Sequence, residues 1–200
     1  MKKYFTVLFL ALMLTGGWLN VSGAEIPVAE YDFDDGSDFP EGWAYDGDVF
    51  SCKPASVFGF EACSGECVLG KSLVSQADVL YTPKILLSAG KKCTVKLSFI
   101  APADAALKDY RSQGFIIKAG STQSLLDHTV QVGVVEAKDH PEWETVSFTF
   151  VPESDGEYCF SISFTDGLAG GSERPVALDD VSILVEESSG DDPENPETPA

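Results

Sequence analysis

Polar and apolar residues alternate along several segments of this chain, and this pattern constrains the fold more than any other feature. Every second residue is apolar at residues 93–99 (CTVKLSF), 145–150 (TVSFTF) and 158–164 (YCFSISF). Because neighbouring side chains of a β-strand point to opposite faces, a period of two predicts strands with one buried face. Shorter candidate strands lie at residues 79–81, 85–87, 115–118, 130–135 and 177–185.

Helices are a minor part of the expected fold. Turn-forming residues separate the strand candidates, and only residues 103–109 and 122–127 have a composition that favours a helix. Many short strands without a repeated strand–helix unit are typical of antiparallel sheets packed face to face. The sequence therefore predicts an all-β antiparallel sandwich.

The chain divides into three segments. Lys2 and Lys3 precede an apolar run at residues 4–14, and small residues follow at 22–24, so residues 1–24 are interpreted as a signal peptide. The apolar run is short for a membrane span, and we expect no membrane insertion after cleavage. Residues 186–200 are acidic and rich in proline, as in a disordered tail or linker. Residues 25–185 remain as one domain.

The charge of the chain excludes some partners. It has 13 Lys and Arg against 32 Asp and Glu, and its formal net charge is −19. Such a surface repels nucleic acids and anionic membranes, so neither is expected to bind. The acidity fits either cation binding or solubility alone.

Carboxylates interrupt apolar residues at both ends of the domain, in YDFDDG at residues 31–36 and VALDDVSI at 176–183. A buried carboxylate is costly unless it is paired or bound to a metal, and basic residues are scarce here. We therefore expect the first and last strands to lie side by side and to share a hard cation such as Ca²⁺, which prefers oxygen ligands. The alternative is that these carboxylates are solvated at strand ends or cap turns.

Five cysteines follow the predicted signal peptide, at positions 52, 63, 67, 93 and 159. Export permits disulfides, and the close spacing of Cys52, Cys63 and Cys67 favours one disulfide within that group, with its pairing left open. The odd number leaves at least one thiol unpaired or pairing between chains. Zinc is a weaker alternative, because the chain has only two histidines and no paired CxxC spacing.

Several short motifs together resemble a known family. They are FD at residues 33–34, FPEGW at 39–43, SG at 64–65, ADVLYTP at 77–83 and LDDVSI at 178–183. Their order and spacing are similar to those of choice-of-anchor J and cleaved-adhesin modules of bacterial surface proteins. The resemblance extends over residues 31–185. It implies a jelly-roll β-sandwich, related in shape to MAM domains and to carbohydrate-binding modules.

The resemblance also implies a function and a metal site. It predicts a secreted or cell-surface module that binds glycan or extracellular protein without catalysis, as an adhesin does. It implies Asp34 and Asp179 as ligands of a structural Ca²⁺, with Asp32 and Asp35 as possible neighbours. Asp180 is expected to face the other side of its strand, since adjacent residues alternate.

Exposed aromatic residues are the candidates for a ligand-binding surface, because their apolar faces stack on sugar rings. Trp143 occupies a polar-face position of its strand, and Tyr110, Phe58 and Phe60 lie in expected loops. For each of them packing is the alternative role. Trp43 is expected to pack.

Catalysis has little support in the sequence. His128 follows Asp127, but no Gly-x-Ser-x-Gly turn accompanies it. A Cys–His pair formed in space stays open, although a disulfide or buried thiol explains each cysteine more simply. The chain is therefore predicted not to be an enzyme. A spacer or assembly domain without a ligand is the alternative function, and a hydrolase carries low weight.

Overall fold

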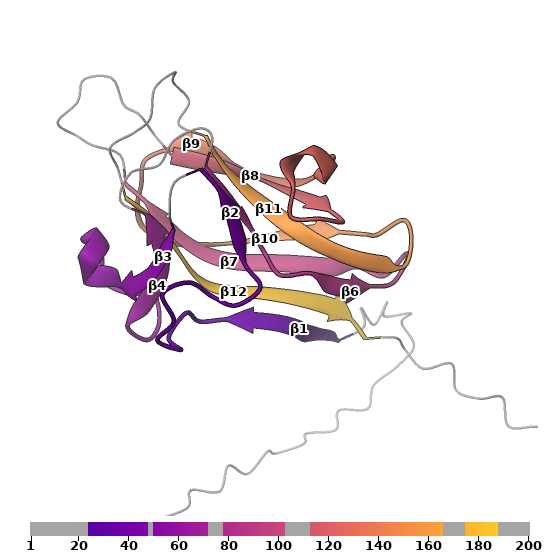
Figure 1. Ribbon diagram of the computed structural model, residues 1–200, viewed down its shortest axis with the longest axis horizontal. Coiled ribbons are helices and arrows are strands. Elements are labelled where there is room, and N and C mark those ends of the chain that lie inside the picture. The colour runs from indigo at the N-terminus through magenta and orange to yellow at the C-terminus, as the bar shows by residue number, and fades with distance from the viewer. Residues whose placement is uncertain (1–23, 48–49, 72–77, 103–112, 166–174, 188–200) are drawn as a thin grey trace, which may run out of the picture.

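The computed structural model describes residues 24–47, 50–71, 78–102, 113–165 and 175–187, and these form a jelly-roll sandwich of two antiparallel sheets (Figure 1). The predicted all-β fold class is confirmed. Among these residues no helix is long and apolar enough to cross a membrane. Most of the expected signal peptide and tail lie outside the described residues.

The first sheet has the order β10–β7–β12–β4–β3, and β1 also pairs with β12. Its strands are β1 (Glu25–Tyr31), β3 (Ser51–Pro54), β4 (Cys67–Lys71), β7 (Cys93–Ala101), β10 (His140–Phe150) and β12 (Val176–Glu186).

The second sheet has the order β2–β5–β11–β8–β9, and β6 also pairs with β11. Its strands are β2 (Ala44–Asp46), β5 (Val79–Tyr81), β6 (Ile85–Leu87), β8 (Gln113–Gly120), β9 (Val130–Lys138) and β11 (Gly156–Thr165). Two 3-10 turns, η1 (Ala55–Phe58) and η2 (Leu125–Asp127), complete the described elements. Only η2 falls within the helix candidate at residues 122–127, and the candidate at 103–109 lies outside the described residues.

The alternating segments supply the core between the sheets. In β7, Val95, Leu97 and Phe99 point inward and are at most 1% exposed, whereas Lys96 between them is exposed. In β11, Phe160 and Ile162 make the matching contribution from the second sheet. The period of two thus identified the inner faces correctly.

A second, smaller apolar cluster covers part of the outer face of the first sheet. Phe58 of η1 packs there with Val68, Ile100 and Ala177, and Trp143 of β10 packs against them. The segment around η1 therefore forms a layer outside the sheet. This layer makes one wall of the site described below.

The first and last strands are neighbours, as predicted. Strand β1 runs antiparallel to β12, from Glu25 opposite Glu186 to Tyr31 opposite Val181. The expected strand at residues 31–36 is wrong, because β1 ends where that stretch begins. Phe33 follows with a φ of 60°, which turns the chain away from the sheet.

Candidate functional site

Two carboxylates from opposite ends of the domain hold one short loop, residues 64–67, which we call the clamped loop. The backbone N–H of Ser64 donates a hydrogen bond to Oδ2 of Asp179 at 3.0 Å. Asp34, just after β1, accepts hydrogen bonds from the other end of this loop. The pairing of β1 with β12 is what brings Asp34 and Asp179 to the same loop.

Asp34 is bound closely by the clamped loop. Its Oδ1 accepts the backbone N–H groups of Cys67 at 2.7 Å and Glu66 at 3.0 Å. These two bonds, that from Cys67 first, hold the pKa of Asp34 below its ordinary value. A Cβ atom on Gly65 would overlap the Asp34 carboxylate, and Gly65 has a φ of +55°. Glycine is therefore required at this position.

Asp179 is a fully buried carboxylate, with 0% of its surface exposed. It accepts the N–H groups of Ser64 and Asp180, and within the described part of the chain it has no ion pair with a basic residue. Burial raises the pKa of Asp179 to about 6, and the nearby charges of Asp180 and Asp34 also raise it. The site thus contains a negative charge without a positive partner.

A β-bulge places Asp180 beside Asp179 instead of opposite to it. The register with β7 shifts between Asp179 and Ser182, and Asp180 has a φ of 48°. A carboxylate oxygen of each aspartate and the Cys63 sulfur lie within 4.8 Å of one another. Asp180 also accepts the Ser64 hydroxyl at 2.7 Å. The expectation that Asp180 faces the other side is therefore wrong.

The four predicted metal ligands separate into two pairs. Asp34 and Asp179 bind opposite ends of the clamped loop, and only Asp179 belongs to the group of ligand atoms within 4.8 Å of one another. Asp32 and Asp35 are exposed and stabilise the turn after β1. Asp32 accepts the N–H of Asp34 at 3.2 Å, and Asp35 accepts the N–H and hydroxyl of Ser37. The uncompensated charge of Asp179, beside other carboxylate oxygens, is a donor set that fits a hard cation.

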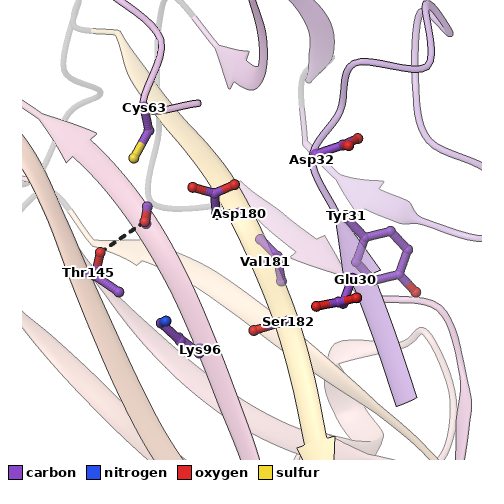
Figure 2. A pocket seen from close by; sticks show the side chains of 10 residues that line it. Glu30, Tyr31, Asp32, Cys63, Lys96, Thr145, Asp180, Val181 and Ser182 are labelled. Carbon is purple, nitrogen blue, oxygen red and sulfur yellow. Dashed lines mark hydrogen bonds between the residues drawn. The ribbon is translucent and has the colours of Figure 1, made fainter. Parts of the chain in front are cut away.

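A groove of about 530 Å³ lies next to this carboxylate cluster, on the outer face of the first sheet (Figure 2). It lies between the η1 segment, β1 and the exposed face of β12, β7 and β10. Its lining residues are Glu30, Tyr31, Asp32, Cys63, Lys96, Ser98, Thr145, Asp180, Val181 and Ser182.

Strand register arranges the groove floor in two cross-strand rows. Glu30 of β1 lies opposite Ser182 of β12, which lies opposite Lys96 of β7. In the next row, Ser98 of β7 lies opposite Thr145 of β10, and their hydroxyls are 3.0 Å apart. Hydroxyl groups and one ammonium group therefore form the floor, with carboxylates at the edges.

None of the predicted aromatic ligand residues that the structure describes, Phe58, Phe60 and Trp143, lines this groove. Phe58 is only 8% exposed, so its expected exposure is wrong; it anchors the η1 segment to the sheet. Phe60 and Trp143 are half-buried against the same cluster, and the Trp143 indole N–H donates to the Glu61 carbonyl at 2.7 Å. Tyr110 lies outside the described residues. Trp43 packs in the core, as expected.

The groove residues were missed because each looks ordinary in the sequence. Lys96, Ser98, Thr145 and Ser182 occupy the polar positions of their strands. Only the strand order shows that these positions face one side together. The alternating pattern did identify these residues as facing outward from their strands. It could not show which strands lie next to one another.

A Cys–His contact does form, but it is buried. Cys159 Sγ lies 3.6 Å from Nε2 of His128, and the two residues are at most 2% exposed. Burial raises the pKa of the Cys159 thiol to about 11, so the thiolate needed for nucleophilic attack is scarce near neutral pH. This pair is a packing contact beside Tyr81.

All five cysteines are free in this structure, and the expected disulfide within the group of Cys52, Cys63 and Cys67 is not formed. Cys52 points into the core from β3, whereas Cys63 lines the groove outside the sheet. The sheet itself separates these two sulfur atoms. Closeness in sequence therefore did not place Cys52 and Cys63 on the same face of the sheet.

Solved structures share this fold at low sequence identity. The K1 cleaved adhesin domain of Lys-gingipain from Porphyromonas gingivalis W83 has a TM-score of 0.52 and 16% identity, over 80% of this chain and 98% of that domain. The CBM22-1 xylan-binding domain of Paenibacillus barcinonensis Xyn10C has a TM-score of 0.56 and 12% identity, over 84% and 99%.

A Stig cyclase from Fischerella sp. TAU has the same fold, with a TM-score of 0.53 and 14% identity over 82% of this chain and 98% of the cyclase. No protein-family model matches the chain, and no curated protein matches it. At these identities the comparisons establish the jelly-roll fold shared with adhesin and carbohydrate-binding domains. Function has to be argued from the site.

Proposed function

We propose that this chain is a non-catalytic binding module of a secreted or cell-surface protein, and that it binds glycan in the groove on the first sheet. One observation carries the proposal: a groove of about 530 Å³ is floored by hydroxyl and ammonium groups and edged by carboxylates. Sugar hydroxyls both donate and accept hydrogen bonds, so they match such a mixed lining. Neighbours of the same fold that are named adhesin or xylan-binding domains support this choice.

Rigid elements position the polar groups of the groove. Lys96 and Ser98 lie on β7, a nine-residue strand in the middle of the first sheet, and Ser182 lies beside them on β12. Tyr31 supplies a half-buried ring at the β1 edge, in contact with Trp43 at a ring-centroid distance of 5.2 Å. A ligand would therefore meet a preformed surface, which lowers the entropic cost of binding.

The same proposal includes a structural calcium ion held by Asp179 together with Asp34 and Asp180; the ligand atoms that already lie within 4.8 Å of one another are those of Asp179, Asp180 and Cys63. Bound calcium would compensate the buried charge of Asp179. The carboxylates of Asp34 and Asp179 themselves fix the clamped loop through its N–H groups, and Cys63, the residue before that loop, forms part of the groove wall. The carboxylate cluster and the groove thus share one wall.

The test is a glycan array followed by calorimetry on two lysine variants. Lys96→Ala removes the ammonium group from the groove floor, and Lys84→Ala removes an exposed lysine that pairs with Glu157 on the second sheet. We expect glycan binding to weaken about fivefold or more in Lys96→Ala and to stay unchanged in Lys84→Ala. Equal binding by both variants, or no glycan binding in any array, would contradict the proposal.

An enzymatic role is the second candidate function of this chain. The observation in its favour is that the same fold is found in a Stig cyclase. If the purified chain turned over an indole substrate of that class, the chain would be an enzyme and not a non-catalytic binding module. A spacer without a ligand would instead give a folded, stable domain that is silent in broad glycan and protein screens.

A further inference from the structure

The groove has an excess of negative charge at its edges. Glu30, Asp32 and Asp180 contribute three carboxylates, and Lys96 is the one basic residue among the described lining residues. Asp32 and Asp180 are already engaged with a backbone N–H and a serine hydroxyl. Within the described structure, the side chains of Glu30 and Lys96 make no hydrogen bond or ion pair. These two charged groups are available to a ligand.

Strand spacing keeps Glu30 and Lys96 apart. Both lie opposite Ser182, one on each side, so two strand spacings of ~4.8 Å separate their backbones. In Figure 2 the Glu30 carboxylate lies on β1 at one side of the groove, and Lys96 lies across β12 from it. The Asp180 carboxylate lies on β12, near Cys63.

We infer that this groove, taken as the glycan site proposed above, rejects acidic sugars and prefers sugar residues that carry a free amine. An ammonium group on a hexosamine would be attracted by Glu30 and Asp180. In the calcium-free domain, the state in which the affinities are to be compared, a uronate or sulfate group would meet three carboxylates against one ammonium, in a chain whose net charge is −19. Lys96 donates hydrogen bonds to neutral hydroxyls in this arrangement.

Three oligosaccharides of equal length test the inference by calorimetry: glucosamine tetramer, its fully N-acetylated form, and galacturonate tetramer. We expect glucosamine tetramer to bind about threefold to fivefold more tightly than the N-acetylated form at low salt. This difference should shrink at about 0.5 M salt, where the Debye length is short. Galacturonate tetramer should not bind measurably.

Conservative variants locate the preference. Glu30→Gln should lower the ratio of glucosamine-tetramer to N-acetylated-tetramer affinity toward one, and Asp180→Asn should act in the same direction. Glu157→Gln on the second sheet is the matched control and should keep the preference; its side chain is 64% exposed and remote from the groove. Thermal melts of all variants separate charge effects from unfolding.

The outcomes distinguish this inference from the proposed function. Equal affinity for the two hexosamine ligands, or tighter binding of galacturonate, overturns the inference while a glycan-binding function stands. Retention of the amine preference in Glu30→Gln and Asp180→Asn also overturns it. Failure of all three oligosaccharides and of a broad neutral array overturns the glycan-binding function itself.

Discussion

Asp34 and Asp179 lie near opposite ends of the domain sequence and bind backbone N–H groups of the same clamped loop. One carboxylate is exposed and its pKa is lowered, whereas the other is buried and its pKa is raised. Two chemically identical side chains thus respond to pH in opposite directions at one loop. Stability measurements can separate them.

Replacement of Gly65 should weaken the clamped loop more than a comparable change elsewhere. Gly65→Ala adds a Cβ that overlaps the Asp34 carboxylate and also strains a backbone with positive φ. We expect a loss of about 2–4 kcal/mol in the free energy of unfolding, measured with urea. Gly59→Ala is the control, because Gly59 has a φ of +85° but nothing within 4 Å of the added atom. That variant should lose only about 1–2 kcal/mol. Equal losses would show that the Asp34 contact is unimportant.

The metal-free domain should become more stable as the pH falls from 7 to 5. The pKa of Asp179 is about 6 in the fold against an ordinary value of 3.8, so folding favours its protonated form. Its stabilising contribution is fully present below pH 3.8 and is lost as the pH rises through 6. The full contribution is about 3 kcal/mol at low pH, and a little over 1 kcal/mol of it is gained between pH 7 and 5.

Asp34 acts in the opposite sense, because its lowered pKa favours the ionised form and its contribution is lost as the pH falls below about 4. Thermal melts in chelator should therefore show a maximum near pH 4. The variant Asp179→Asn should lose the rise between pH 7 and 5 and keep the fall at low pH. A wild-type melting temperature that is flat from pH 7 to 5 would contradict this account.

Calcium should raise the melting temperature at neutral pH. If the carboxylates of Asp34 and Asp179 bind it only in the folded state, calcium at a hundred times its dissociation constant adds about 2.7 kcal/mol. Scanning calorimetry in calcium and in chelator measures the shift. Asp179→Asn should abolish it, and Glu157→Gln should retain it. An unchanged melt in chelator would count against the metal site.

Thiol reactivity should separate the exposed cysteine from the buried ones. Burial raises the pKa of Cys52 and Cys93 to about 12, and the Cys159 thiol is also inaccessible, whereas Cys63 is exposed in the groove. In native protein at pH 8, an aromatic disulfide reagent should modify Cys63 first. The variant Cys63→Ser should lose this fast phase. A fast phase that persists in Cys63→Ser would mean that another thiol is accessible.

The sequence predicted the strands in which polar and apolar residues alternate cleanly and missed β4, in which they do not. Strands β7 and β11 alternate cleanly because one face of each is buried in the core. Strand β4 lies beside β12 in the first sheet, yet Val68 and Leu69 are adjacent and both fully buried. Leu69 faces the core and Val68 faces the outer cluster under Phe58. Local periodicity cannot predict such a strand, since its outer cover comes from a distant segment.

The candidate site, like the set of strands, was predicted from the sequence only in part. Carboxylates amid apolar residues pointed to the two ends of the domain, and Asp34 and Asp179 do bind the same loop, whereas a shared cation stays a prediction. The bulge at Asp180 was not predictable, because it depends on the register between β12 and β7. The groove needed the order of four strands, which the polar positions of Lys96 or Ser182 do not encode by themselves.

The antiparallel pairing of β1 with β12 also determines how the domain responds to pulling. The described chain enters at Ala24 and leaves at Glu187, whose N–H donates to the Ala24 carbonyl at 2.7 Å. A force applied between these two points loads the hydrogen bonds of the two strands one after another, so the strands unzip and do not shear. Tension would therefore open β1 progressively from this end. The last interactions to be reached are those of Asp34 and Asp179 with the clamped loop, at the far end of the pair.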